Sequence, residues 1–266
     1  LASGFIRATG LWLTCHWRPG RLVKGSGIRS MLAFGGNLTG FNVVNYFARN
    51  LDKAVLGRAW GDEQVGLYSK AYSLLLLPIR AVNGPITSVA VPALSRLQND
   101  GPRYVHVYKR FLSFITFVTM PIVVLCFLYS DALVLLILGD RWLAAAGIFR
   151  VLAVSGFMAT FNVATGWVYI SLGQTDRMFR AGIFTSLVTA LSFFIGVRWG
   201  ALGIAYAYVI SSVAVRYPAI VYCYRRTPVA VTDLLGAIWQ TVMSSLLKGG
   251  LLWLLLTFAR DLVSNR

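Results

Sequence analysis

Positively charged side chains within apolar stretches are the chemically most informative feature of this sequence. An Arg or Lys at bilayer depth costs roughly 2.5–3.5 kcal/mol on insertion scales, so it requires a partner, a cavity or a path back to the interface. No acidic residue lies clearly in the middle of an apolar stretch to pair with these cations. Arg binds phosphate through two parallel hydrogen bonds and Lys binds it as a point charge, so the pattern predicts a phosphate- or pyrophosphate-bearing ligand. The residues concerned are Arg7, Lys70, Arg80, Arg150 and Lys248.

Arg80 differs from the other cations because it lies between two prolines. Pro78 and Pro85 each remove a backbone donor, so we expect the helix to be broken or kinked around Arg80. Discontinuous helices line the substrate path in many transporters. For each of these cations, a long side chain that reaches back to the membrane interface is the alternative explanation.

A second group of polar side chains recurs every three or four residues along one apolar stretch. Asn42, Asn45, Tyr46 and Arg49 share one face of the predicted helix, and Lys53 follows them. Hydrogen bonds between helices, worth about 0.6–2 kcal/mol each, are one interpretation. The other is that this face lines a hydrophilic cavity. On that interpretation the residues expected to contact the ligand are Asn42, Asn45, Tyr46, Arg49, Lys53, Lys70, Arg80, Asn83 and Arg150.

Residues able to perform catalytic or metal chemistry are few. His16 and His106 have no carboxylate partner nearby in the sequence, and the three cysteines lie far apart without metal-ligand spacing. No phosphate-binding glycine loop, nucleophile elbow or zinc-binding pair is present. We therefore expect no enzyme activity, no cofactor and no metal. Acids between the apolar stretches could serve an extracytoplasmic enzyme, although such carboxylates are far more often simply solvated: Asp52, Asp62, Glu63 and Asp140.

The elements that position these residues must be membrane-spanning helices. The 266 residues are 57% hydrophobic and 13% charged, about half the charge of an ordinary soluble domain, which excludes a soluble enzyme and a disordered chain. Backbone groups in lipid must pair internally, and the apolar runs do not alternate as β-barrel strands do. The predicted fold is all-α, a polytopic membrane helical bundle with about seven transmembrane helices and a partial one at the N-terminus. The expected spans are 1–14 (partial), 31–47, 67–91, 111–129 with an apolar extension at 133–138, 144–172, 183–197, 201–215 or 224, and 234–259.

The net charge of +16 is distributed over short segments between the spans. Because no basic stripe on a polar domain results, we expect acidic membrane lipids rather than nucleic acid as the partner of these charges. Segments 16–30, 96–110, 177–180 and 216–226 fall on one side of the membrane and hold thirteen Lys and Arg, against seven on the other side. The positive-inside rule places that side in the cytoplasm.

Several motifs of this sequence resemble those of one transporter family. The chain is similar to the polysaccharide transporter family, the Wzx-type flippases of lipid-linked oligosaccharides within the multidrug/oligosaccharidyl-lipid/polysaccharide exporter superfamily. The resemblance covers about residues 30–180 well and the remainder by span pattern only. Its motifs are FNVVNYFARNLDK at 41–53, LGR at 56–58, GLYSKAY at 66–72, LP at 77–78, NGP at 83–85, VPALSRLQ at 91–98, LGDRW at 138–142, TGW at 165–167 and LGQTDR at 172–177.

The resemblance implies two lobes of six helices around a cationic cavity in the bacterial inner membrane. Alternating access would carry a polyprenyl-pyrophosphate-linked oligosaccharide of exopolysaccharide or O-antigen type to the periplasmic leaflet. Any carboxylate that carries a coupling ion would then lie in a missing N-terminal lobe, which would be the main protein partner. The implied divisions are the end of a preceding helix (1–15), a cytoplasmic loop (16–30), a C-terminal lobe of six helices (31–224) and a linker with one further helix (225–266). The start at Leu1 rather than Met agrees with a piece of a longer protein.

Three alternatives remain open at this point. A multidrug exporter of the same superfamily would show acidic residues in its cavity, where this sequence has cations. A membrane-embedded polysaccharide polymerase or ligase would need a large periplasmic loop and paired catalytic groups, and the longest loop expected on that side is about residues 50–65. A truncated remnant without transport activity would lack any lobe encoded upstream.

Overall fold

The computed structural model describes residues 4, 9–10, 12–14 and 28–264. The chain divides into two units, residues 1–33 and 34–266, and the second holds the helices described below. The described residues form helices and turns without a β-strand, which confirms the predicted all-α fold. Arg7, much of the expected helix end at 1–15 and nearly all of the expected loop at 16–30 lie outside the described residues. The helices are α2 (Ile28–Arg96), α3 (Gly101–Leu128), α4 (Ser130–Leu138), η1 (Asp140–Ala145), α5 (Ala146–Ser171), α6 (Thr175–Gly196), η2 (Val197–Trp199), α7 (Gly200–Tyr224) and α8 (Val231–Ser264).

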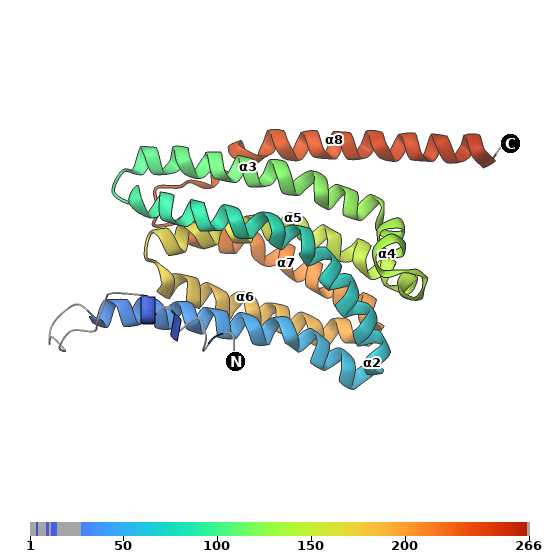
Figure 1. The fold of residues 1–266 in the computed structure, drawn as a ribbon, viewed down its shortest axis with the longest axis horizontal. Helices are drawn as coiled ribbons and strands as arrows, with labels where there is room; N and C mark the ends of the chain where they lie inside the picture. The colour runs from blue at the N-terminus through green and yellow to red at the C-terminus, as the bar shows by residue number, and fades with distance from the viewer. Residues whose placement is uncertain (1–3, 5–8, 11, 15–27, 265–266) are drawn as a thin grey trace. The chain divides into compact units, whose positions relative to one another are not determined.

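Helix α2 turns back on itself at Gly61 (Figure 1). The backbone there has φ 79° and ψ −178°, a conformation that glycine adopts readily because it has no Cβ. Two arms result, residues 34–60 (the first arm) and residues 62–96 (the second arm). They correspond to the predicted spans 31–47 and 67–91, each extended towards the bend by polar residues.

The second arm continues through its prolines. Pro78, Pro85 and Pro92 all lie inside α2, and Gly61 is the residue of this helix at which φ and ψ leave the helical range. The break predicted around Arg80 is therefore wrong, because the interruption occurs at Gly61. Neighbouring helices can stabilise a proline-containing membrane helix, and buried residues of the second arm on both sides of Arg80 pack into the protein core.

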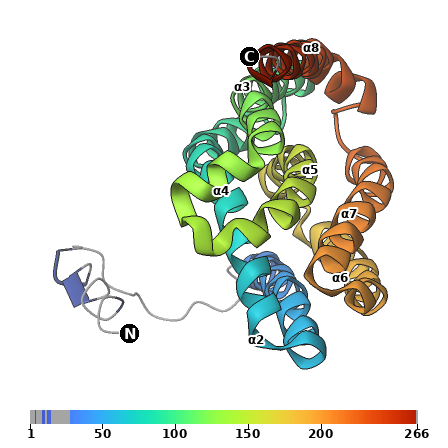
Figure 2. The same cartoon turned by 90° about the vertical axis from the view of Figure 1, so that its right-hand side faces the viewer.

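Helix α5 lies at the centre of the bundle, between α3 and α7 (Figure 2). Its Trp167 also reaches the second arm, where the indole Nε1 donates to Oγ1 of Thr87 at 2.9 Å. The first arm packs on α6 through glycines: a Cβ on Gly40 would lie 2.9 Å from a ring carbon of Phe179, and a Cβ on Gly182 would overlap the ring of Phe41. Small residues allow such close approach between membrane helices.

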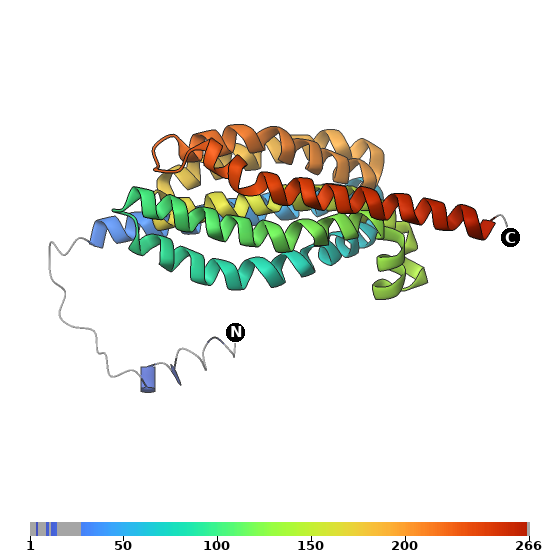
Figure 3. The same cartoon turned by 90° about the horizontal axis from the view of Figure 1, so that it is seen from above.

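Four segments of the described chain are long and apolar enough to cross a membrane, namely 28–96, 101–128, 140–171 and 175–224. The first turns back at Gly61 and the last at η2, so these segments provide six passes (Figure 1). Helix α8 packs along α3 as the seventh long helix (Figure 3). The predicted apolar extension at 133–138 is a separate short helix, α4, that turns away from α3.

The helix connections alternate between two ends of the bundle (Figure 1). At one end, which we call the bend end, Nε1 of Trp60 donates to the carbonyl oxygen of Val197 at 2.6 Å and joins the α2 bend to η2. At the other end, which we call the basic end, Nε2 of Gln174 donates to the carbonyl oxygen of Arg226 at 3.1 Å. The helix ends that meet at the basic end carry several cations, namely Arg96, Arg103, Arg177, Arg225 and Arg226. The positive-inside rule assigns this end to the cytoplasm.

Candidate functional site

Part of the predicted polar face lines an exposed edge of the first arm. Asn42, Tyr46 and Arg49 are exposed, and Lys53 is half-buried. The ion pairs among the described residues do not include Arg49. This edge therefore presents uncompensated positive charge beside hydrogen-bonding groups, as an anionic ligand requires.

Asn45 departs from this edge. Its amide nitrogen donates to the carbonyl oxygen of Phe41 at 2.9 Å and lies close to Gly182 of α6. Asn45 thus occupies the interface between the first arm and α6. Its position agrees with the alternative in which span asparagines serve helix packing, and it does not contact the exposed edge.

The second arm exposes a further set of predicted residues. Lys70 and Arg80 are exposed, and Lys70 lies over the ring of Trp142 with 5.2 Å from Nζ to the centroid. Asn83 is half-buried, and its Oδ1 is buried without a hydrogen-bond partner in the described chain. Exposed residues on the same helical face as Arg80 include the small Ser73, Gly84 and Ser88 and the larger Leu77, which is 63% exposed.

Six predicted site residues of the two arms, five of them exposed and Lys53 half-buried, form a set that we call the α2 stripe. The small side chains of Gly84 and Ser88, one and two turns after Arg80, leave room for a polar ligand beside its guanidinium. The stripe lies on the surface of the described chain, and the groove that the structure defines lies elsewhere, on α3. The α2 stripe comprises Asn42, Tyr46, Arg49, Lys53, Lys70 and Arg80.

Arg150 was predicted to be an unpaired cation, and the structure corrects this. Its guanidinium forms an ion pair with Asp131 and its Nε donates to Oγ of Ser130 at 2.7 Å. The acid belongs to α4, which the sequence pattern did not distinguish from the end of α3. Because α4 folds onto the start of α5, Arg150 has a counter-ion near the bend end. We therefore no longer count Arg150 among the residues of the candidate site.

Asp52 is a functional candidate that the sequence analysis placed wrongly in a solvated connection. It lies within the first arm and is 3% exposed. Tyr68 of the second arm faces its carboxyl group. The signal that could have located it is the lack of Gly and Pro between Phe47 and Leu56, which indicates that the helix continues past Asp52.

Arg216 was likewise assigned to a cytoplasmic connection, but it lies inside α7. One of its terminal nitrogens donates to Oδ1 of Asn162 in α5, and its Nε is buried without a partner among the described residues. The helix continues to Tyr224, which puts Arg216 about 12 Å from that end at 1.5 Å per residue. The apolar run 217–224 after Arg216 was the signal that it lies in the membrane.

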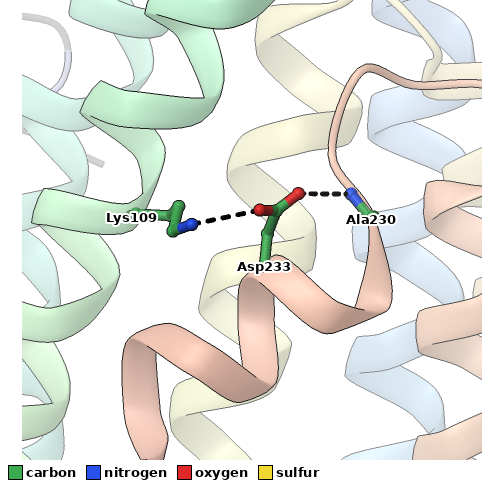
Figure 4. Close-up of polar contacts among 3 residues, drawn as sticks. All are labelled: Lys109, Ala230 and Asp233. Atoms are coloured by element: carbon green, nitrogen blue, oxygen red, sulfur yellow. Dashed lines mark hydrogen bonds and ion pairs between the residues drawn. The ribbon is translucent and has the colours of Figure 1, made fainter.

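A shallow groove of about 600 Å³ lies at the basic end of α3. Beside it, Nζ of Lys109 contacts Oδ1 of Asp233 at 3.1 Å, while Oδ2 of Asp233 accepts from the backbone N–H of Ala230 at 3.0 Å (Figure 4). That backbone hydrogen bond, followed by Lys109, lowers the pKa of Asp233, which precedes the apolar stretch 234–259. The contact anchors the start of α8 to α3. The groove is lined by Pro102, Val105, His106, Lys109, Arg110 and Ser113.

Comparison with known proteins identifies the family. A family described as "Polysaccharide biosynthesis protein" matches residues 1–147, more than half of the chain. The chain belongs to this family. The resemblance inferred from the sequence motifs is thereby confirmed, and with its apolar helices the chain is a multi-pass protein of the inner membrane.

Curated relatives of this polysaccharide biosynthesis family are similar over most of the chain. The teichuronic acid biosynthesis protein TuaB of Bacillus subtilis is 28% identical over 198 residues, which is 74% of this chain and 41% of the relative. The lipopolysaccharide biosynthesis protein WzxC of Escherichia coli is 25% identical over 195 residues, which is 73% of this chain and 40% of the relative. The amylovoran biosynthesis protein AmsL of Erwinia amylovora is 24% identical over 66% of this chain and 45% of the relative. The chain thus spans less than half the length of these relatives.

Two solved membrane proteins share the fold. The lipid II flippase MurJ in an inward closed conformation matches 97% of this chain and 60% of its own, with a TM-score of 0.63 and 16% identity. An outward-facing multidrug resistance MATE transporter matches 85% of this chain and 56% of its own, with a TM-score of 0.64 and 18% identity. The helices of this chain therefore have a fold that is also found in membrane transporters.

Proposed function

We propose that this chain acts in a transporter that moves a polyprenyl-pyrophosphate-linked oligosaccharide from the cytoplasmic to the periplasmic leaflet of the inner membrane. The observation that carries the proposal is the fold shared with a protein named as a lipid II flippase over nearly the whole chain. Relatives named for teichuronic acid, lipopolysaccharide and amylovoran biosynthesis support a repeat unit of exopolysaccharide or O-antigen type as cargo. The activity is transport rather than bond-making chemistry.

The α2 stripe supports an anionic head group as the ligand. Arg49 and Arg80 are exposed on different arms, and neither forms an ion pair within the described chain. Each guanidinium can bind a phosphate oxygen pair in a bidentate manner. Asn42 and Tyr46 offer hydrogen bonds to sugar hydroxyls, so the stripe has a group for each part of the cargo head while the polyprenyl tail remains in lipid.

Alternating access requires a second structural unit opposite the α2 stripe. We assign residues 31–224 to the C-terminal lobe and residues 225–266 to a linker with one additional helix, with an N-terminal lobe of the same protein as the partner. Residues 1–15 would end the helix before this lobe, and residues 16–30 would form a cytoplasmic loop. Rocking of the two lobes about a central site would then expose the stripe to one leaflet at a time.

A multidrug exporter is the second candidate, favoured by the equally good fold match to a MATE transporter. A cationic drug would meet Arg49, Lys53 and Arg80 in the stripe, and like charges repel it. A polymerase or ligase is less compatible, because the described connections at the bend end are short: Gly61, η1 and η2. The charge of the stripe therefore favours the phosphorylated cargo.

Complementation tests the proposal. The full-length protein is expressed in a strain that lacks its polysaccharide flippase, and surface polymer is measured. We expect restoration by the wild type, strong loss with Arg49→Gln and Arg80→Gln, and no loss with Arg198→Gln, an exposed cation at the bend end. Normal polymer with both stripe variants would refute the assigned site, and failure of well-expressed wild type would refute the function.

A further inference from the structure

Asp52 is a buried carboxyl group with little to compensate a negative charge. At 1.5 Å per residue it lies about 13 Å before Gly61 along the first arm. Neither ion pair of the described residues includes it. The hydrogen bond that its Oδ1 accepts comes from the adjacent backbone N–H of Lys53, at 2.6 Å. Burial of a carboxylate without a counter-ion is costly, so the described conformation favours the neutral acid.

The phenol of Tyr68 faces Asp52 from the second arm. Its hydroxyl is buried and has no hydrogen-bond partner of regular geometry in the described chain. A neutral carboxyl can donate to this hydroxyl, whereas an ionised carboxylate can only accept from it. Either form of Asp52 can therefore hydrogen bond with Tyr68, and the proton on Asp52 sets the direction of that bond. Because they belong to opposite arms, that contact joins the two sides of the bend at Gly61.

The groups around this pair are mostly aromatic. Tyr72 stacks on Tyr68 with ring centroids 6.1 Å apart, and Tyr208 of α7 meets Tyr72 edge-on at 6.1 Å. On the first arm itself, Arg49 and Lys53 are the cations within electrostatic range of this cluster. From the other elements, Arg216 of α7 lies within electrostatic range of Tyr208, and Lys70 of the second arm lies over the ring of Trp142. Arg150 of α5 pairs with Asp131, and the charged residues of α6 lie at its start, at the basic end: Asp176, Arg177 and Arg180.

We propose that Asp52 is the proton-binding residue through which a proton gradient drives movement of α2 about Gly61, an inference that rests on the proposed transport function. With the arms closed, the carboxyl is buried and carries its proton. When the arms separate, water reaches the carboxyl, which becomes a carboxylate and releases the proton to solvent without any other bond change. Protonation thus favours the closed hinge and release favours the open hinge, since each form of Asp52 stabilises one conformation.

A proton fits this site better than a metal cation. Hard metal cations require several oxygen ligands, whereas Asp52 and Tyr68 supply one carboxyl and one phenol. Within the described residues, no group of three or more His, Cys, Asp and Glu side chains is placed to hold a metal. The proposal thus places the coupling carboxylate in this chain, whereas the sequence motifs led us to expect it in a missing lobe.

Proteoliposomes containing the full-length protein provide the test. The probe is a fluorescent polyprenyl-pyrophosphate oligosaccharide, whose movement between leaflets is followed with a membrane-impermeant quencher. We expect the wild type to equilibrate the probe without a gradient and several-fold faster with an imposed pH gradient. The Asp52→Asn variant should keep the gradient-free rate and lose the acceleration, Tyr68→Phe should weaken the acceleration, and the exposed control Asp62→Asn should behave as wild type.

Acceleration that persists in Asp52→Asn, or that depends on sodium rather than protons in the wild type, overturns the proposal. If Asp52→Asn does not fold, Tyr68→Phe decides: unchanged acceleration in that variant overturns the proposal. If the wild type moves no probe, the transport function fails by itself. Proton binding is then tested by infrared difference spectra. A titrating carboxyl band that is present in the wild type, missing in Asp52→Asn and shifted in Asp52→Glu supports the assignment. A band that is unchanged in both variants refutes it.

Discussion

Trp60 at the bend of α2 donates a hydrogen bond from its indole Nε1 to the carbonyl oxygen of Val197, 2.6 Å away. The side chain of Gln64 makes a second, longer link there, with Oε1 accepting from the backbone N–H of Ala201 at 3.4 Å. These contacts tie the bend to the turn between α6 and α7. Movement of the hinge must therefore break or carry along this junction.

Trp60→Phe should lower the unfolding free energy of the purified protein in detergent by about 1 kcal/mol, because one hydrogen bond is lost while an aromatic ring remains. Thermal unfolding followed by circular dichroism measures the change. Trp239→Phe is the control, since Trp239 on α8 is also an exposed tryptophan, at 63% against 49% for Trp60. Equal shifts in the two variants would contradict a specific role of the Trp60 bond.

Gly61→Ala should destabilise the protein by roughly 1–3 kcal/mol, because a residue with a Cβ is strained at φ 79° and ψ −178°. Gly166→Ala is the control. Gly166 lies inside α5 with open space around an added Cβ, so alanine there should be neutral or stabilising by up to about 1 kcal/mol. Chemical denaturation of both variants checks the difference, and a stable Gly61→Ala protein would argue against a fixed bend.

Gly182→Ala should weaken the contact between α6 and the first arm, because its methyl group overlaps the ring of Phe41. Phe41→Leu should relieve part of that overlap. A double-mutant cycle measured by thermal unfolding should therefore give a coupling energy of about 0.5–3 kcal/mol. Additive effects of the two substitutions would mean that Gly182 and Phe41 do not touch.

Arg150→Gln should leave surface polymer near the wild-type level in the complementation strain. The partner Asp131 is well exposed, so loss of the pair should cost at most about 1 kcal/mol of stability. Arg80→Gln, which removes an unpaired cation of the α2 stripe, should have the much larger effect. Loss of polymer with Arg150→Gln as severe as with Arg80→Gln would return Arg150 to the candidate site.

Hydrophobic runs were sufficient to predict the helices and their alternation, because the bilayer imposes both length and internal hydrogen bonding. Where helices end was harder to predict, because membrane helices continue through polar residues that pack internally. Asp52 and Arg216 were placed in connections for this reason, although α2 and α7 extend beyond both.

Partners distant in sequence could not be predicted from composition. Arg150 finds Asp131 because α4 folds onto α5, and Lys70 lies over Trp142 of η1. Local proline chemistry suggested a break near Arg80, yet the backbone turns at Gly61, where a glycine can adopt positive φ. The α2 stripe itself was largely predictable, since helical spacing alone groups Asn42, Tyr46 and Arg49.

The most direct measurement of the central claim, that the α2 stripe borders an aqueous path for an anionic cargo, is thiol accessibility in membranes. In a background with Cys15, Cys126 and Cys223 replaced by Ala, Arg49→Cys and Arg80→Cys are treated with a charged, water-soluble thiol reagent. Leu187→Cys on the exposed apolar side of α6 is the lipid-facing control. We predict rapid labelling of both stripe positions, slowed by added polyprenyl-pyrophosphate oligosaccharide, and no labelling of the control. Unreactive cysteines at 49 and 80 would contradict the account, because those side chains would then face acyl chains.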